Sequence, residues 1–316
     1  MVDVAGILIT GLQQGAIYAL LGIGLTIILG TMQFLNLAHG ALYLVGAYTG
    51  LLVVREISVQ EGALAGIVAD PTAFGIGSSF LVALVVTPIL MFAIGVAMER
   101  FVARPLYDRS EVEQLLLTFG LALIVEELAR QLIGSQPFSS YAPEELFGVV
   151  VSGQANIPFV GQYPRWRFVV IGLTFLLIGA TYLVIERTDF GMVVKAGTRD
   201  SEMVRLLGID ITRSYALVFG VGAALAGLAG LVGGTIIDVA PGIGTNNALV
   251  PAFLTVVVGG AGSVVGAIVG GIVLGMVAAV FQFQAPQWSQ IVLFGFVAVF
   301  LLVRPEGLFG SVEVGE

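Results

Sequence analysis

Five polar side chains stand out in the first two apolar stretches of the sequence. Gln13, Gln14 and Tyr18 fall in the first stretch, and Asn36 and His39 fall at the start of the second. Polar groups are costly in hydrocarbon and usually face a bundle interior or a cavity. We therefore expect Gln14, Tyr18, Asn36 and His39 to line a path for a polar or zwitterionic cargo. The alternative is that they form interhelical hydrogen bonds that hold two spans together.

Other chemistry is largely excluded by what the sequence lacks. It has no cysteine and one histidine, which excludes disulfides, thiolate metal sites and a multi-histidine metal centre. There is no nucleotide-binding P-loop, no Gly-x-Ser-x-Gly elbow and no His-Glu-x-x-His motif. We expect no catalytic residue, no metal and no cofactor bound by this chain. The formal net charge is −8, and we expect no nucleic acid among its partners.

The composition indicates a membrane protein. Of 316 residues, 58% are hydrophobic and only 11% are charged, whereas a soluble domain carries about 25% charged residues. Apolar runs of about 20 residues, enough to cross a bilayer, recur along the whole chain. We predict an all-α polytopic bundle forming one transmembrane domain over residues 1–316. We expect a multi-pass membrane protein.

Hydropathy predicts about eight spans, with eight to ten as the range. The seventh is too long for one straight helix and contains the glycine-rich stretch 259–263, where we expect a break. Between the spans we expect a cytoplasmic loop over 186–214 and extracytoplasmic loops over 134–167 and 237–249. The predicted spans are Ala5–Gly30, Phe34–Val54, Ile76–Met98, Gln114–Ile133, Phe168–Ile185, Tyr215–Ile236, Val250–Val280 and Trp288–Val303.

The few basic residues indicate the orientation. Five of the thirteen lie in the loop 186–214, and three more lie between spans three and four, on the same side. The positive-inside rule makes that side cytoplasmic. Eight simple crossings would put both termini outside, yet Arg304 directly follows the last span and favours a cytoplasmic C-terminus. One extra crossing or a re-entrant segment would remove this conflict.

Three local patterns add detail. Small residues four apart, such as Gly11 and Gly15, predict close helix packing. Glu126 and Arg130 have i,i+4 spacing, which predicts an ion pair near the outer interface. In the basic loop, Asp200 can cap a short amphipathic helix over 201–207 that ends at Gly208. The exposed apolar side of such a helix is expected to bind a partner, and its mixed charges favour a protein somewhat over the membrane surface.

Several motifs together resemble the permease subunits of branched-chain amino-acid ABC importers of bacteria and archaea. The resemblance covers nearly the whole chain, and the sequence is closer to the shorter of the two permease types. Glu126 and Glu127 depart from it, because a more apolar span is expected there. The matching motifs are Gly11-Leu-Gln-Gln-Gly15-Ala-Ile-Tyr18, Gly24-Leu-Thr26, Asn36-Leu-Ala-His39-Gly40, Gly191 with Lys195-Ala196, Asp200 with Arg205-Leu-Leu-Gly208, Gly259-Gly-Ala-Gly-Ser263 and Arg304-Pro-Glu-Gly307.

The resemblance implies a machine with several subunits. Its expected partners are cytoplasmic ATPase subunits, which carry the ATP, a second permease subunit, an extracytoplasmic solute-binding protein and the lipid bilayer. Closure of the ATPases would switch the bundle between inward-facing and outward-facing states. The residues that the resemblance assigns to coupling with the ATPase are Lys195, Ala196, Asp200, Arg205, Leu206 and Gly208.

Two alternatives stay open at this point. Permeases for urea and short amides are closely similar, so the same machine with that cargo is the nearest alternative. An ion-coupled secondary transporter is an alternative of another class, and it should show intramembrane acids or an inverted repeat. Neither feature is clear in the sequence.

Overall fold

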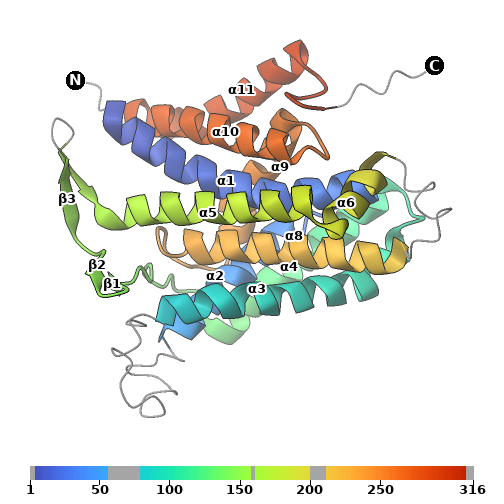
Figure 1. Cartoon of the computed structure of the whole chain (residues 1–316), viewed down its shortest axis with the longest axis horizontal. Helices are drawn as coiled ribbons and strands as arrows, with labels where there is room; N and C mark the ends of the chain where they lie inside the picture. The colour runs from blue at the N-terminus through green and yellow to red at the C-terminus, as the bar shows by residue number, and fades with distance from the viewer. Residues whose placement is uncertain (1–3, 56–78, 158–160, 200–210, 311–316) are drawn as a thin grey trace.

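The computed structural model describes residues 4–55, 79–157, 161–199 and 211–310, and it is an all-α membrane bundle, as predicted (Figure 1). Two short antiparallel hairpins, β1–β2 and β3–β4, decorate one end of it. The α-helices are α1 (Val4–Met32), α2 (His39–Arg55), α3 (Ser79–Met98), α4 (Glu111–Ile133), α5 (Arg165–Arg187), α6 (Asp189–Arg199), α8 (Ile211–Gly233), α9 (Val250–Gly259), α10 (Val264–Gln284) and α11 (Ser289–Val303). The remaining elements are the π-helices η2 (Glu99–Ala103) and η4 (Gly244–Leu249), the 3-10 helices η3 (Arg104–Leu106) and η5 (Pro286–Trp288), and the strands β1 (Glu145–Leu146), β2 (Val149–Val150), β3 (Gln154–Ile157) and β4 (Gly161–Pro164).

Among the described residues, six helical stretches are long and apolar enough to cross a membrane. The helices α2 and α4 run beside them, although α2 has only 17 residues and α4 carries several charges. Capping residues determine where these helices begin and end, which a hydropathy average does not locate. Ser110 and Glu113 form a capping box, so α4 begins at Glu111 instead of the predicted Gln114. The six stretches are Val4–Met32, Ser79–Leu106, Arg165–Arg187, Thr212–Gly233, Val264–Gln284 and Pro286–Val303.

The expected break in the seventh predicted span is confirmed. α9 ends at Gly259, and α10 begins at Val264. Gly260 between them has φ +96°, which a residue with a side chain rarely adopts. Ser263 then accepts a hydrogen bond from the backbone N–H of Gly266, 3.0 Å away, and so caps α10. The break therefore has glycine on one side and a capping hydroxyl on the other.

The predicted extracytoplasmic loop 237–249 differs in structure from the expected connector. From Gly244 onward it is helical, and η4 continues into α9 to make one short helix, Gly244–Gly259. We call this element the half-helix. With this element in the chain, the start of α1 and the end of α11 lie at opposite ends of the bundle (Figure 1). The segment after α11 folds back onto the end of the half-helix, where Leu308 N–H donates to Val258 O at 2.8 Å.

The core forms where α1 packs against α10 and α8, and α8 against α2 and α3. Glycines make these contacts close, as the spacing predicts. A Cβ atom on Gly275 of α10 would overlap the backbone of Gly15 on α1, and one on Gly46 of α2 would overlap Gly227 on α8. In lipid the helices associate through such packing and not through the hydrophobic effect, so close backbone approach is what holds the bundle together.

Candidate functional site

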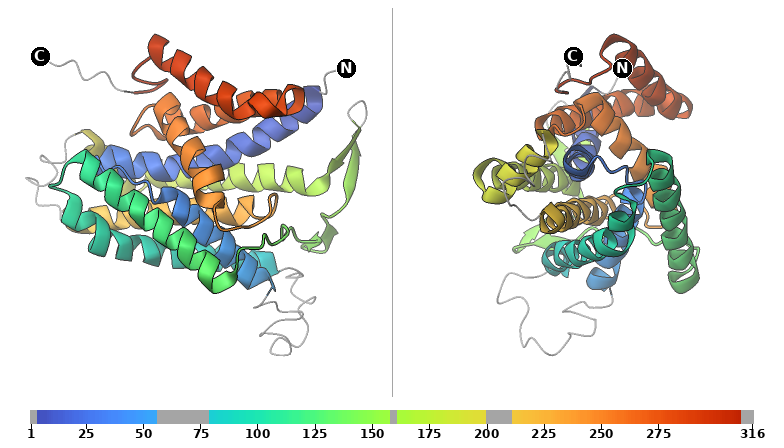
Figure 2. Two further views of the ribbon diagram at one scale, coloured as in Figure 1. Left: turned by 180° about the vertical axis from the view of Figure 1, so that it is seen from behind. Right: turned by 90° about the vertical axis from the view of Figure 1, so that its right-hand side faces the viewer.

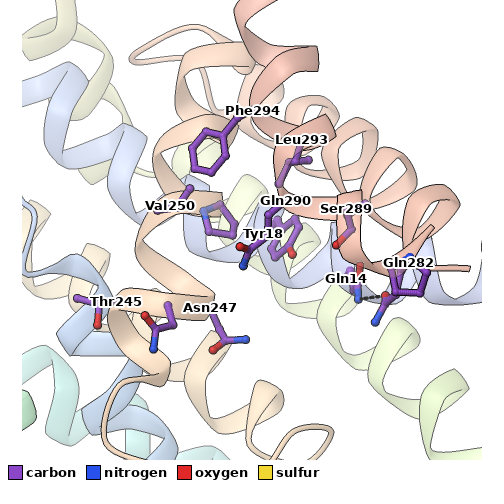
Figure 3. A pocket seen from close by; sticks show the side chains of 14 residues that line it. Gln14, Tyr18, Thr245, Asn247, Val250, Gln282, Ser289, Gln290, Leu293 and Phe294 are labelled. Carbon is purple, nitrogen blue, oxygen red and sulfur yellow. Dashed lines mark hydrogen bonds between the residues drawn. The ribbon is translucent and has the colours of Figure 1, made fainter.

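A cavity of about 550 Å³ lies between α1, the half-helix, α10 and the start of α11 (Figure 3). Its wall combines carboxamides and hydroxyls with aliphatic and aromatic groups, and none of its lining residues is ionisable at neutral pH. A volume of this size lies within the range of roughly 300–1,000 Å³ typical of small-molecule sites. The lining residues are Gln14, Tyr18, Thr245, Asn246, Asn247, Val250, Pro251, Ala278, Gln282, Pro286, Ser289, Gln290, Leu293 and Phe294.

Two of the four residues predicted for the path lie in this wall. Gln14 and Tyr18 are four residues apart on α1, which places them on one face of the helix. The Gln14 side chain donates from Nε2 to Oε1 of Gln282 on α10 at 2.9 Å, which closes one side of the cavity (Figure 3). The Tyr18 ring lies between the half-helix and α11 (Figure 3). The polar face of α1 therefore points toward this space.

The other two predicted residues, Asn36 and His39, lie in packed surroundings and do not line the cavity. Both are fully buried at the start of α2. The Asn36 side-chain oxygen accepts from the backbone N–H of Ala38 at 3.1 Å, which shapes the turn into α2. His39 Nε2 lies 3.1 Å from the carbonyl oxygen of Leu21 on α1. The His39 contact matches the interhelical hydrogen bonding that is the alternative for these residues, whereas the Asn36 bond is local. Their role in a path stays a prediction.

The sequence contained four further cavity carboxamides that we did not single out. Asn246 and Asn247 lie in the segment predicted as an outer loop, and Gln282 lies between two predicted spans. Gln290 lies inside the last predicted span, where a carboxamide among apolar residues was a visible signal. The first two were missed because the half-helix begins at Gly244, six residues before the predicted start at Val250. Neutral carboxamides offer both donors and acceptors, so this wall can orient a zwitterion without placing a fixed charge beside it.

The expected ion pair between Glu126 and Arg130 is wrong. Arg130 binds Glu127 instead, at 2.6 Å, on the exposed side of α4. Glu126 points inward and is 8% exposed. Its carboxylate accepts hydrogen bonds from the backbone N–H of Thr245, at 2.9 Å, and from the Thr245 hydroxyl. The physical reason is the N-terminal turn of the half-helix, whose free N–H groups attract a carboxylate.

The residues predicted for coupling lie partly in α6. Thr188 accepts a hydrogen bond from Gly191 N–H at 3.3 Å, and the tight turn from α5 leaves no room for a side chain at Gly191. Lys195 pairs with Glu186 at 2.7 Å, and Ala196 is exposed beside it. The remaining four residues, Asp200, Arg205, Leu206 and Gly208, and the short helix predicted over 201–207, lie outside the described residues.

One face of α6 is therefore exposed and the other is packed. Val194 is 4% exposed, whereas Met192 on the other face is 62% exposed. Gly197 lies against Thr31 near the end of α1. An exposed methionine next to a lysine suits contact with another protein, because Met adapts its shape and Lys adds a charge. The sequence predicted an amphipathic loop here but not the helix Asp189–Arg199.

A bundle of apolar helices around an uncharged polar cavity defines a multi-pass membrane protein of the transport class. Residues 7–302 match the family described as branched-chain amino acid transport system / permease component. The chain belongs to this family, and it is a multi-pass protein of the prokaryotic cell membrane.

The curated relatives agree with this family over nearly their whole lengths. The chain is 31% identical to the high-affinity branched-chain amino acid transport system permease protein BraD of Pseudomonas aeruginosa, over 97% of this chain and 96% of that protein. It is 29% identical to the permease proteins named LivH of Salmonella typhimurium and Escherichia coli, over 96% of this chain and 94% of each. No solved structure matches the chain.

Proposed function

We propose that this chain is the permease subunit of an ATP-driven importer for branched-chain amino acids, and that the cavity is its cargo site. The single observation that carries this proposal is the wall of the cavity. Carboxamides and hydroxyls can bind the ammonium and carboxylate groups of an amino acid, while Val250, Leu293 and Phe294 offer an apolar surface to an aliphatic side chain.

The same wall bears on the alternative cargo. Urea and short amides would be satisfied by carboxamides such as Gln282 and Gln290, but they carry no aliphatic group that would use Leu293 and Phe294. Burial of apolar surface contributes about 25 cal/mol per Å², so the apolar half of the wall favours leucine, isoleucine or valine. Cargo choice is also made by the solute-binding protein that we propose as a partner.

The alternative of another class, an ion-coupled transporter, requires an acid that exchanges ions with the path. Glu126 is a buried acid on α4, but among the described residues both of its hydrogen bonds come from Thr245, and it does not line the cavity. We infer instead that ATP bound to separate cytoplasmic subunits drives transport, with this chain binding no cofactor. The exposed face of α6, with Lys195 and Ala196, and the adjoining segment with Asp200, Arg205, Leu206 and Gly208 would contact those subunits.

The test begins with purification of the tagged chain from its native membranes in mild detergent, with its companions identified by mass spectrometry. The co-purified assembly is then reconstituted into proteoliposomes, and uptake of labelled leucine and of labelled urea is measured with ATP inside or outside. Leucine uptake that needs ATP and persists with a protonophore and a sodium ionophore supports the proposal. Uptake that collapses with either ionophore and ignores ATP would overturn it in favour of an ion-coupled transporter.

Two variants test the coupling segment in the same assembly. Charge reversal at Arg205 and the substitution Gly208→Pro are each expected to abolish uptake while membrane insertion stays intact. Normal ATP-dependent uptake by both variants would remove this segment from the coupling role, whatever cargo is carried.

A further inference from the structure

Glu126 is an acid in an apolar span whose partners lie far along the chain. It belongs to α4, and the carboxylate binds Thr245 of the half-helix, 119 residues away in sequence. Its neighbour Glu127 points to the other side of α4, where it binds Arg130 and Gln131. A buried carboxylate is costly in a membrane protein and calls for a compensating interaction. Within the described part of the chain, both hydrogen bonds to the Glu126 carboxylate come from Thr245.

The bond from Thr245 also fixes a wall of the cavity. The side chain of Thr245 lines the cavity, as do its neighbours Asn246 and Asn247. On the opposite side of this turn, Gly244 lies so close to Gly40 of α2 that a Cβ atom on either would meet the backbone of the other. The first turn of the half-helix is thus clamped between α2 and α4, and Figure 2 shows α4 running past it. Movement of this turn would displace Asn246 and Asn247 directly.

We propose that Glu126 is a positioning residue for the cargo cavity, which it shapes by holding the first turn of the half-helix through Thr245. This inference rests on the proposed function of the cavity. Glu126 is absent from the lining, so its effect on cargo is indirect. Glu126 therefore acts on the shape of the site.

Matched variants of the two adjacent acids test the proposal in the reconstituted importer, with leucine as the probe. Glu126→Gln has nearly the same shape but lacks the charge, and Thr245→Val lacks the hydroxyl. Each is expected to raise the KM for uptake about tenfold, with Vmax and the amount of assembled complex changed less than about twofold. Thr245→Ser, which keeps a hydroxyl donor, is expected to recover most of the KM lost in Thr245→Val. The control is Glu127→Gln, which removes the adjacent carboxylate that binds Arg130 and Gln131 on the exposed face of α4.

The outcomes separate this proposal from the function on which it rests. If Leu293→Ala and Phe294→Ala raise KM while Glu126→Gln behaves like Glu127→Gln, the cavity binds cargo and the positioning role is wrong. If the cavity-wall variants leave KM unchanged, the cavity is not the cargo site and the proposed function fails first. Should Glu126→Gln fail to assemble, the Thr245 pair decides, because a purely structural role predicts no KM difference between valine and serine there.

A cargo-independent measurement checks the contact itself. The chain has no cysteine, so Glu126→Cys with Thr245→Cys introduces the only thiols. A short bifunctional thiol reagent is expected to link these two positions in native membranes. The pair Glu127→Cys with Thr245→Cys should not be linked, because the Glu127 side chain leaves α4 in the other direction. Equal linking of both pairs would contradict the arrangement.

Discussion

Gln14 on α1 and Gln282 on α10 form a hydrogen bond of 2.9 Å across the wall of the cavity, although 268 residues separate them in sequence. The two helices that they join also make a close glycine contact in the core, at Gly15 and Gly275. The polar pair therefore stands at the place where two spans touch and where the cavity begins. An amide pair in such a setting serves both packing and the site.

Replacing one member of this pair should lower the free energy of unfolding more than replacing both. Gln282→Leu leaves the half-buried Gln14 amide without its partner, which we expect to cost about 1 kcal/mol of folding free energy, whereas Gln14→Leu leaves the exposed Gln282 amide and should cost less. The double variant should be at least about 1 kcal/mol more stable than the sum of the single effects. The measurement is a double-mutant cycle on thermal stability in detergent, with Gln131→Leu on the exposed face of α4 as the control.

The glycine contacts give a prediction with a matched pair. Gly275→Ala places a methyl group against the backbone of Gly15, and we expect a loss of about 1–3 kcal/mol, because overpacking forces the helices apart. Gly179→Ala on α5 meets no atom within 4 Å, and it should be neutral or stabilise the helix by up to about 1 kcal/mol. Melting of the two purified variants, followed by size-exclusion chromatography, tests this. Equal melting temperatures would mean that α1 and α10 are not in close contact.

Some features of this fold and site were predictable, and others were not, for physical reasons. Hydropathy locates spans, and glycine at 259–263 locates a break, because both are local properties of the chain. Gln14 and Tyr18 were visible as polar residues within an apolar run. Glu126 was visible in the same way, but its bond to Thr245 was not, because nothing local relates residues 119 apart. The half-helix begins before the predicted start at Val250, because its first turn, Gly244–Leu249, has the composition of a loop and is held as a helix by tertiary contacts.

A buried cluster at the C-terminal end of α3 gives a further prediction. Glu99 is fully buried, and its carboxylate accepts hydrogen bonds from Arg104 at 3.1 and 3.2 Å and from the Tyr107 hydroxyl at 2.7 Å. The Tyr107 ring also lies edge-on to Tyr215 in the first turns of α8, with 5.4 Å between ring centroids. Tyr107→Phe keeps the ring but removes a hydrogen bond to a charged group, which we expect to cost about 1.5–3 kcal/mol.

The same cluster predicts a pH dependence. Burial, and then the hydrogen bond to the Glu99 carboxylate, raise the pKa of Tyr107 above its ordinary value of 10.0. A raised pKa of this kind means that the contribution to stability is fully present below pH 10 and is lost as pH rises above it. Melting temperatures of the wild type and of Tyr107→Phe should therefore differ by a constant amount from pH 7 to 9 and converge above pH 10. A difference that grows with pH would contradict this assignment.

The orientation of the bundle can be tested because the chain has no cysteine. Glu145 is exposed on β1, at the end of the bundle that carries the hairpins, and Glu306 is exposed after α11, at the opposite end. Arg100, Arg104 and Arg109 follow the C-terminal end of α3, which lies at the same end of the bundle as the end of α11 (Figure 1). The positive-inside rule therefore predicts that this end is cytoplasmic. In intact cells, Glu145→Cys should react with a membrane-impermeant maleimide, whereas Glu306→Cys should react only after permeabilisation. Labelling of both variants in intact cells would mean that the two ends of the bundle do not lie on opposite sides of the membrane. Labelling of Glu306→Cys alone would mean that the bundle has the opposite orientation.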